Sequence, residues 1–173
     1  TLRQYSESHT LPLAVRSSAL NEDASHTASA GLFRTYFIPN RGPDRFRQLC
    51  EAIKLVYASA FYADVHHFLR THNIPREEGQ MAVALETVVG TCRANAHFPL
   101  VGGVAQSLNF FPVGAMRAED GVANIVMGLG SRAVSGSDGL RFCPAYPTIR
   151  PGLQSRTEVE LYAQRVIEAV DLD

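Results

Sequence analysis

The chain has 173 residues, which suits one domain with a hydrophobic core. Apolar residues make up 46% and charged residues 19% of it, an ordinary globular composition that argues against extensive disorder. The formal net charge of −1 gives no electrostatic reason to expect a nucleic-acid or membrane partner. Any anion site must therefore be local.

The cysteines and the first residue of the chain suggest its cellular compartment and its relation to a longer polypeptide. Cys50, Cys92 and Cys143 are widely spaced and include no C-x-x-C pair, so we expect a reducing, cytoplasmic setting without a disulfide framework or zinc cluster. No apolar run approaches the length of a membrane helix. Because the chain begins at Thr1 without a processing signal, we expect a piece of a longer polypeptide, with residues 1–173 forming a single partial domain.

The first half of the chain predicts two strands followed by two helices. An apolar run predicts a short strand over 11–15 that delivers Arg16 at its end, and a polar loop is expected over 17–29. A second strand is expected over 32–38. Apolar residues at helical spacing then predict a helix over about 44–62, with a shorter helix over 63–71.

The second half predicts mainly strands. The apolar run 81–89 is typical of a strand buried on both faces, and further strands are expected over 102–109, 123–127 and 140–143. An acidic turn is expected at 119–121 and a short helical or turn segment up to Gly136, with a proline-marked extended exit after residue 143. A capping-box pattern at 157–160 predicts a C-terminal helix. The fold class is therefore α+β, with a mixed or mostly antiparallel sheet and flanking helices.

The stretch VRSSALNEDASHTASAGLFRTYF, residues 15–37, carries the first candidate site. Arg16 offers a permanently charged fork suited to phosphate oxygens, and Gly31 allows backbone N–H groups to approach an anion. Thr35 adds a hydroxyl group. The alternative is a surface salt bridge for Arg16 and an ordinary hairpin around Gly31, and local pattern alone leaves both open.

The strand ALETVVG, residues 84–90, carries the second candidate site. A strand that leaves into a glycine-ended linker can present backbone N–H and C=O groups to a purine edge. The Glu86 carboxylate could accept a hydrogen bond from an exocyclic amine or a ribose hydroxyl. The alternative is a plain core strand.

Other motifs give weaker evidence for a functional site. Gly128 and Gly130 can bring backbone near a ligand, but they lack the third glycine of a dinucleotide fingerprint, and a simple turn is the alternative. The histidines show no metal-ligand spacing, and neither a G-x-S-x-G motif nor a P-loop motif occurs. The sequence therefore predicts neither a metal site nor a nucleophilic serine.

Taken in order, five segments resemble one family. VRSSALNEDASHTASAGLFRTYF is similar to the R-S-S-x-x-E-D segment and the following A-G-x-x-x-T-Y of phosphoenolpyruvate synthases, pyruvate phosphate dikinases and rifampicin phosphotransferases. EAIKLVYASAF, MAVALETVVG, GGVAQSLN and NIVMGLGSRAVSG resemble the segments that follow there. The order and spacing hold over residues 12 to about 147, whereas 148–173 do not match.

The resemblance implies an ATP-grasp-type nucleotide-binding domain with ATP and Mg²⁺ as cofactors. In this family a phosphoryl group of ATP passes to a histidine on a separate domain, and then to pyruvate or another acceptor. By matching position, Arg16 would contact the phosphates, and the loop Gly31, Leu32, Phe33 and Thr35 would cover them. Glu86, Thr87 and Val88 would line the adenine and ribose.

The sequence also departs from the family pattern, and these departures bear on the expected activity. The phosphate-binding lysine, the metal-binding Glu and Gln, the phosphohistidine and the acceptor domain are expected outside this segment. Glu86 and Leu32 each stand where many members have Gln. We therefore expect part of an ATP-dependent phosphotransferase that is inactive alone. The alternative is a nucleotide-sensing regulatory domain without phosphotransfer, and a scaffold that binds no nucleotide is a third hypothesis.

Overall fold

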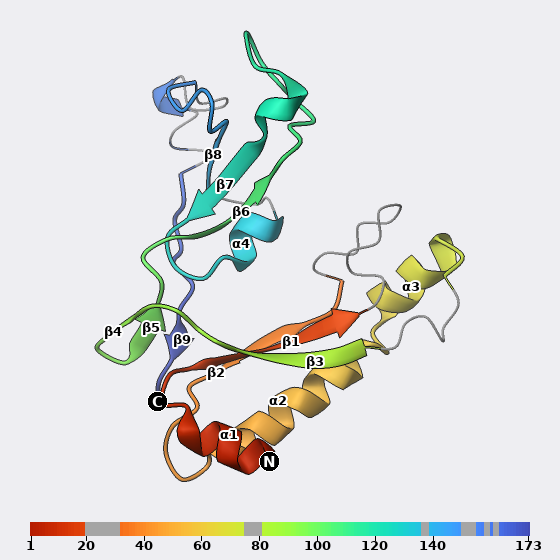
Figure 1. Ribbon diagram of the computed structural model, residues 1–173, viewed down its shortest axis with the longest axis vertical. Coiled ribbons are helices and arrows are strands. Elements are labelled where there is room, and N and C mark those ends of the chain that lie inside the picture. Colours follow the sequence, from red (N-terminus) through yellow and green to blue (C-terminus); the bar gives the residue numbers. More distant parts are fainter. Residues whose placement is uncertain (20–31, 75–80, 136–138, 150–154, 158–159, 161–162) are drawn as a thin grey trace. The chain divides into compact units, whose positions relative to one another are not determined.

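The computed structural model describes residues 1–19, 32–74, 81–135, 139–149, 155–157, 160 and 163–173 (Figure 1). These residues fall into two compact units, and each is described below by itself. The first unit comprises Thr1–His97 with Val170–Asp173, and the second comprises Phe98–Ala169. The single partial domain expected from the sequence stays a prediction.

The first unit is built on an antiparallel sheet of three strands in the order β2-β1-β3. The strands are β1 (Leu13–Ala19), β2 (Thr35–Ile38) and β3 (Met81–Thr87). In the central strand, Arg16 lies opposite Thr35 on one side and opposite Ala84 on the other. Arg16 therefore sits in the middle of β1, and the prediction that a strand ends there and a loop begins at residue 17 is wrong.

Helix α2 (Arg45–Ser59) covers one face of this sheet (Figure 1). Its buried residues Leu49, Ala52 and Val56 follow helical spacing and pack against Leu13 and Val15 of β1. Burial of such side chains contributes roughly 1.5–3 kcal/mol each, which holds the helix on the sheet. Helix α3 (Ala63–Thr71) follows, so both helices expected in this region are confirmed.

Among the described residues of the first unit, the opposite face of the same sheet carries exposed side chains, and we call it the open face. Side chains alternate between the two faces of a strand, so Leu13 and Val15 point into the core while Arg16 points away from it. Along β3 no residue is fully buried, and Ala82 and Glu86 are exposed. The prediction that this strand is buried on both faces is therefore wrong. Its small alanines are apolar in sequence, but they lie on the open side.

The structure contains elements that the sequence pattern did not predict. Helix α1 (Leu2–Ser8) begins with a capping box between Thr1 and Gln4. A second small sheet has the order β4-β5-β9, formed by β4 (Thr91–Arg93), β5 (Ala96–Phe98) and β9 (Val170–Asp171). The Leu172 N–H donates to the Asn95 carbonyl at 2.8 Å, and the Arg41 Nε–H donates to the Leu172 carbonyl at 2.6 Å.

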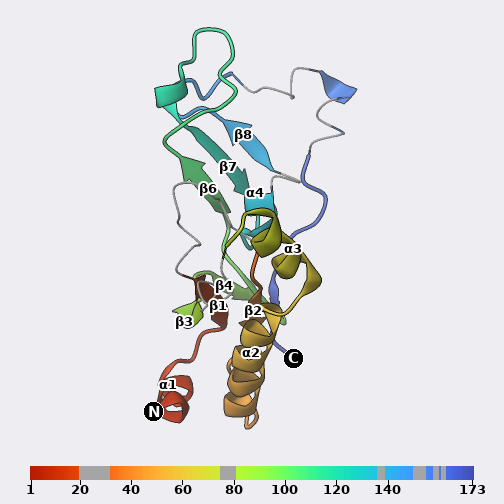
Figure 2. The same ribbon diagram turned by 90° about the vertical axis from the view of Figure 1, so that its right-hand side faces the viewer.

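The second unit has an antiparallel sheet in the order β6-β7-β8, whose strands lie side by side in Figure 2. They are β6 (Gly102–Gln106), β7 (Val122–Val126) and β8 (Leu140–Phe142), with a short turn of 3₁₀ helix, η2 (Ala118–Asp120), and helix α4 (Ser131–Ser135). With the sheet of the first unit, these elements confirm the α+β class with mostly antiparallel strands.

The C-terminal segment differs from its prediction. Residues 156, 157 and 160 are helical, but residues 163–169 are not helical, and β9 follows them. Two contacts within the second unit hold this segment. The Gln164 amide exchanges hydrogen bonds with the backbone of Met127, and the Leu129 N–H donates to the Glu168 carbonyl at 3.0 Å. These tertiary contacts override the helical spacing of Val166 and Ile167, so the predicted long helix is wrong.

Candidate functional site

The open face of the β2-β1-β3 sheet brings three predicted site residues together. Arg16, Thr35 and Glu86 come from its three different strands and are all exposed. Arg16 and Thr35 are directly paired, and Glu86 pairs with Ala14, two residues before Arg16. Residues paired across an antiparallel sheet, and residues two apart in a strand, share a face. A cation, a hydroxyl and a carboxylate therefore lie on one surface.

Arg16 and Glu86 form an ion pair across β1 and β3. The Arg16 Nη1 atom lies 3.8 Å from the Glu86 Oε1 atom, and the side chains are 44% and 55% exposed. An exposed pair of this kind contributes only about 0–1 kcal/mol to stability because water screens it. Exchanging the carboxylate for a ligand anion would therefore cost the fold little. The salt-bridge alternative for Arg16 is real, but it does not exclude an anion site.

An apolar floor lies between these polar groups. Ala14 pairs with both Phe37 and Glu86, and Ala84 pairs with Arg16. Phe37 is 36% exposed, so part of its ring faces solvent. Sequence reasoning missed these three residues as parts of the site. The two-residue period that runs through Arg16 and Glu86 could have placed Ala14 and Ala84 beside them.

The predicted phosphate-covering loop is described only in part. Gly31 lies outside the described residues, Leu32 is half-buried, and Phe33 is only 8% exposed. The Phe33 side chain therefore packs inward, which leaves its backbone as the group that could face a ligand. Arg34 anchors the end of this segment, since its N–H donates to the Ser59 hydroxyl and its guanidinium pairs with Asp64 at 3.0 Å.

Thr87 and Val88 are placed differently from Glu86. Thr87 pairs with Leu13, so its side chain belongs to the α2 side of the sheet. Val88 is 7% exposed, its N–H donates to the Pro12 carbonyl at 2.9 Å, and its carbonyl accepts from His97 Nε2 at 2.9 Å. The sequence predicted backbone groups open to a purine edge, but the N–H and the carbonyl of Val88 both already have hydrogen-bond partners. The next residue, Val89, is 80% exposed.

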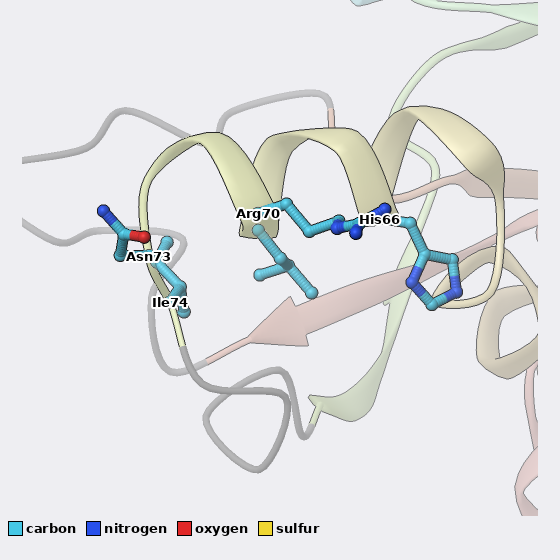
Figure 3. Close-up of a pocket in the computed structure, with 5 residues that line it drawn as sticks. His66, Arg70, Asn73 and Ile74 are labelled. Atoms are coloured by element: carbon cyan, nitrogen blue, oxygen red, sulfur yellow. The ribbon is translucent and has the colours of Figure 1, made fainter.

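A separate pocket of about 590 Å³ lies along α3 (Figure 3). Its described lining consists of His66, Leu69, Arg70, Asn73 and Ile74, so it includes none of the predicted site residues. Among the described residues, no group of three or more His, Cys, Asp and Glu side chains could hold a metal ion. In the same part of the chain, no helix is long and apolar enough to cross a membrane.

One titrating group stands at the edge of the sheet. The hydroxyl groups of Tyr36 in β2 and Tyr62 before α3 lie 3.4 Å apart. The hydrogen bond with Tyr62 raises the pKa of Tyr36 above its ordinary value of 10.0, and partial burial adds to this, whereas the positive charge of Arg34 opposes it. Tyr36 is therefore neutral at physiological pH and joins the sheet to the start of α3.

A comparison with protein families shows which family the chain is related to. A family model described as the pyruvate phosphate dikinase AMP/ATP-binding domain matches residues 1–155. The chain belongs to this family. The pyruvate phosphate dikinase match spans the open sheet face and every predicted site residue, and it identifies the chain as a nucleotide-binding domain of a dikinase-like enzyme. Searches of curated proteins and of solved structures gave no match to the chain.

Proposed function

We propose that the open face of the β2-β1-β3 sheet is the ATP-binding surface of a phosphoenolpyruvate-synthase-like phosphotransferase. The observation that carries the proposal is the meeting of Arg16, Thr35 and Glu86 on one exposed face in a chain of the pyruvate phosphate dikinase family. A guanidinium, a hydroxyl and a carboxylate recognise different parts of a nucleotide.

Each group has a defined role in this proposal. Arg16 binds phosphate oxygens through charge-assisted hydrogen bonds, and Thr35 adds a hydroxyl donor beside it. Glu86 accepts from a ribose hydroxyl or an exocyclic amine. Gly31, Leu32 and Phe33 contribute backbone N–H groups to the phosphates, and Thr87 and Val88 lie at the adenine end. The exposed ring of Phe37 gives the face an apolar surface for a base.

The parent reaction is the one that the family resemblance implies. A phosphoryl group of ATP passes to a histidine on another part of the parent protein, and then to pyruvate or another acceptor. Mg²⁺ neutralises the phosphate charge in such transfers, and its ligands are expected outside this segment. What the chain itself supplies is the orientation of the nucleotide. Alone, it should therefore bind ATP without turning it over.

Titration calorimetry of the chain with Mg-ATP tests the binding step. We expect the unchanged chain to give a saturable binding heat with Mg-ATP. Arg16→Ala should weaken the affinity by about tenfold or more, because a charge-assisted hydrogen bond is worth about 1.5–3 kcal/mol. Equal binding by both proteins would contradict the assignment of Arg16. A chain that folds but gives no heat with ATP would contradict the proposed function at this face.

Phosphotransfer is tested on the full-length parent with ATP labelled in its β-phosphate. The proposal expects acid-labile, base-stable label on a histidine. ATP binding without any label on protein would instead indicate a nucleotide-sensing domain.

A further inference from the structure

Cys92 and His97 form a side-chain pair in the small sheet of the first unit. Cys92 lies in β4 and is exposed, whereas His97 lies in β5 and is 0% exposed. The Cys92 Sγ atom is 3.3 Å from the Nδ1 atom of His97. This distance is within hydrogen-bond range for sulfur, so a solvent-facing thiol contacts a buried imidazole.

The second ring nitrogen of His97 fixes which atom carries the proton. Its Nε2 atom lies 2.9 Å from the Val88 carbonyl oxygen. A carbonyl oxygen can only accept a hydrogen bond, so Nε2 must be the donor. In neutral imidazole the other nitrogen is then an acceptor, and Nδ1 receives the Cys92 S–H. The Val88 carbonyl therefore holds His97 in the tautomer that can take a proton from the thiol.

The surrounding sheet holds this geometry in place. His97 is paired with Val170 of β9, and its ring is enclosed, so it is not free to turn away from the thiol. The other two cysteines have different surroundings. Cys143 is buried and donates to the Asp120 carbonyl at 3.7 Å, a group that cannot accept a proton, and Cys50 is half-buried on α2. Cys92 alone of the three combines exposure with a histidine base.

We propose that Cys92 is a thiol-modification site for low-molecular-weight disulfides, with His97 as the proton acceptor. The thiolate is the form that attacks a disulfide, so removal of the thiol proton promotes the exchange. The Cys92 proton passes to His97 Nδ1, and the Cys92 sulfur attacks one sulfur of the disulfide. The new Cys92 S–S bond forms as the old S–S bond breaks, and the departing thiolate takes the proton from His97. No net oxidant beyond the disulfide is required.

The test uses the whole 173-residue chain and oxidised glutathione. Peptide mass spectrometry follows the glutathione adduct at each cysteine over time. We expect Cys92 to be modified first, and His97→Gln to slow this by at least about tenfold, a threshold set below the roughly 10²–10⁴-fold that a general base typically contributes. Glutamine can keep a donor to the Val88 carbonyl while it removes the acceptor at Nδ1. An unchanged thermal unfolding midpoint shows that the variant remains folded.

A second comparison keeps the test decisive if His97→Gln fails to fold. Lys54 is an exposed residue of α2, so Lys54→Cys combined with Cys92→Ser gives an exposed thiol on a different element of the same unit. We expect the native Cys92 to react at least about tenfold faster than this introduced thiol. Equal rates at the two thiols, or an unchanged rate at Cys92 in a folded His97→Gln chain, would overturn the proposal. None of these readouts depends on nucleotide binding, so they stand apart from the proposed function.

Discussion

Arg16 and Glu86 approach to 3.8 Å across neighbouring strands, although they belong to two segments assigned to opposite ends of a nucleotide. The contact is diagonal, because Arg16 pairs with Ala84 and Glu86 pairs with Ala14. The two ends of the proposed ATP site are thus coupled through one guanidinium. An anion that binds Arg16 must compete with Glu86 for its guanidinium, so substitution of either residue should change the affinity for the anion.

Arg16→Ala should weaken Mg-ATP binding by about tenfold or more, since one charge-assisted contact of about 1.5–3 kcal/mol is lost. Stability should hardly change, because the exposed pair with Glu86 contributes only about 0–1 kcal/mol. Arg47→Ala is the matched control, as Arg47 is also an exposed arginine that pairs with carboxylates, those of Asp44 and Glu51. Calorimetry and urea unfolding measure the two effects. Equal loss of affinity in both variants would show that Arg16 has no specific phosphate role.

Glu86→Gln should change the affinities for two ligands by different amounts. Inorganic tripolyphosphate should bind more tightly, because the neutral amide no longer competes with the anion for Arg16. ATP should gain less than tripolyphosphate, because the ribose or amine contact loses its charged acceptor. Calorimetry with both ligands at one salt concentration gives the ratio. An equal gain in affinity for both ligands would contradict the assignment of Glu86 to the nucleoside end.

Local patterns were sufficient for the helices of the first unit. The expected helices over 44–62 and 63–71 correspond to α2 at Arg45–Ser59 and α3 at Ala63–Thr71. A long apolar stripe at a period of 3.6 residues has no competing interpretation, because a strand would scatter it over both faces. The capping box at Thr1 and Gln4 was an equally local signal for α1, and it was overlooked.

The open face could not be derived in the same way. Ala82 and Ala84 are apolar, so β3 was predicted to be buried on both faces, yet burial depends on which side α2 covers. Likewise, the approach of Arg16 to Glu86 depends on the register between two strands that are distant in sequence. The family resemblance pointed to both residues as site residues, but it did not predict that they contact each other. The roles assigned to them remain predictions for the experiments above.

Tyr62→Phe should lower the pKa of Tyr36 toward its ordinary value of 10.0, because it removes the hydrogen bond that contributes most to the raised pKa. In the unchanged chain the folded state holds the Tyr36 proton more tightly than the unfolded state. The associated stability is therefore fully present below about pH 10, and it is lost as the pH rises through the folded-state pKa. NMR titration of the Tyr36 ring carbon follows this change directly.

Tyr57→Phe provides the control for this titration. Tyr57 is another tyrosine of the first unit, on α2 and 49% exposed. Its loss should leave the titration of Tyr36 unchanged. If Tyr36 titrates identically in the unchanged chain and in Tyr62→Phe, the hydroxyl contact at 3.4 Å does not persist in solution.

Asn40 follows β2 and is hydrogen-bonded to the segment before β1, and two substitutions of this residue should separate backbone from side-chain effects. It is 0% exposed, and its Nδ2 donates to the carbonyls of His9 at 2.8 Å and Leu11 at 3.4 Å. Its φ of 51° is in the left-handed region, which glycine adopts freely and alanine does not. Asn40→Gly should destabilise the first unit by about 1–3 kcal/mol, since the backbone carbonyls of His9 and Leu11 lose the donor that Asn40 supplies. Asn40→Ala should cost about 1 kcal/mol more than Asn40→Gly, because its Cβ strains the backbone. Urea unfolding of the two variants beside the unchanged chain gives both differences, and an alanine variant at least as stable as the glycine variant would show that φ at residue 40 relaxes without cost.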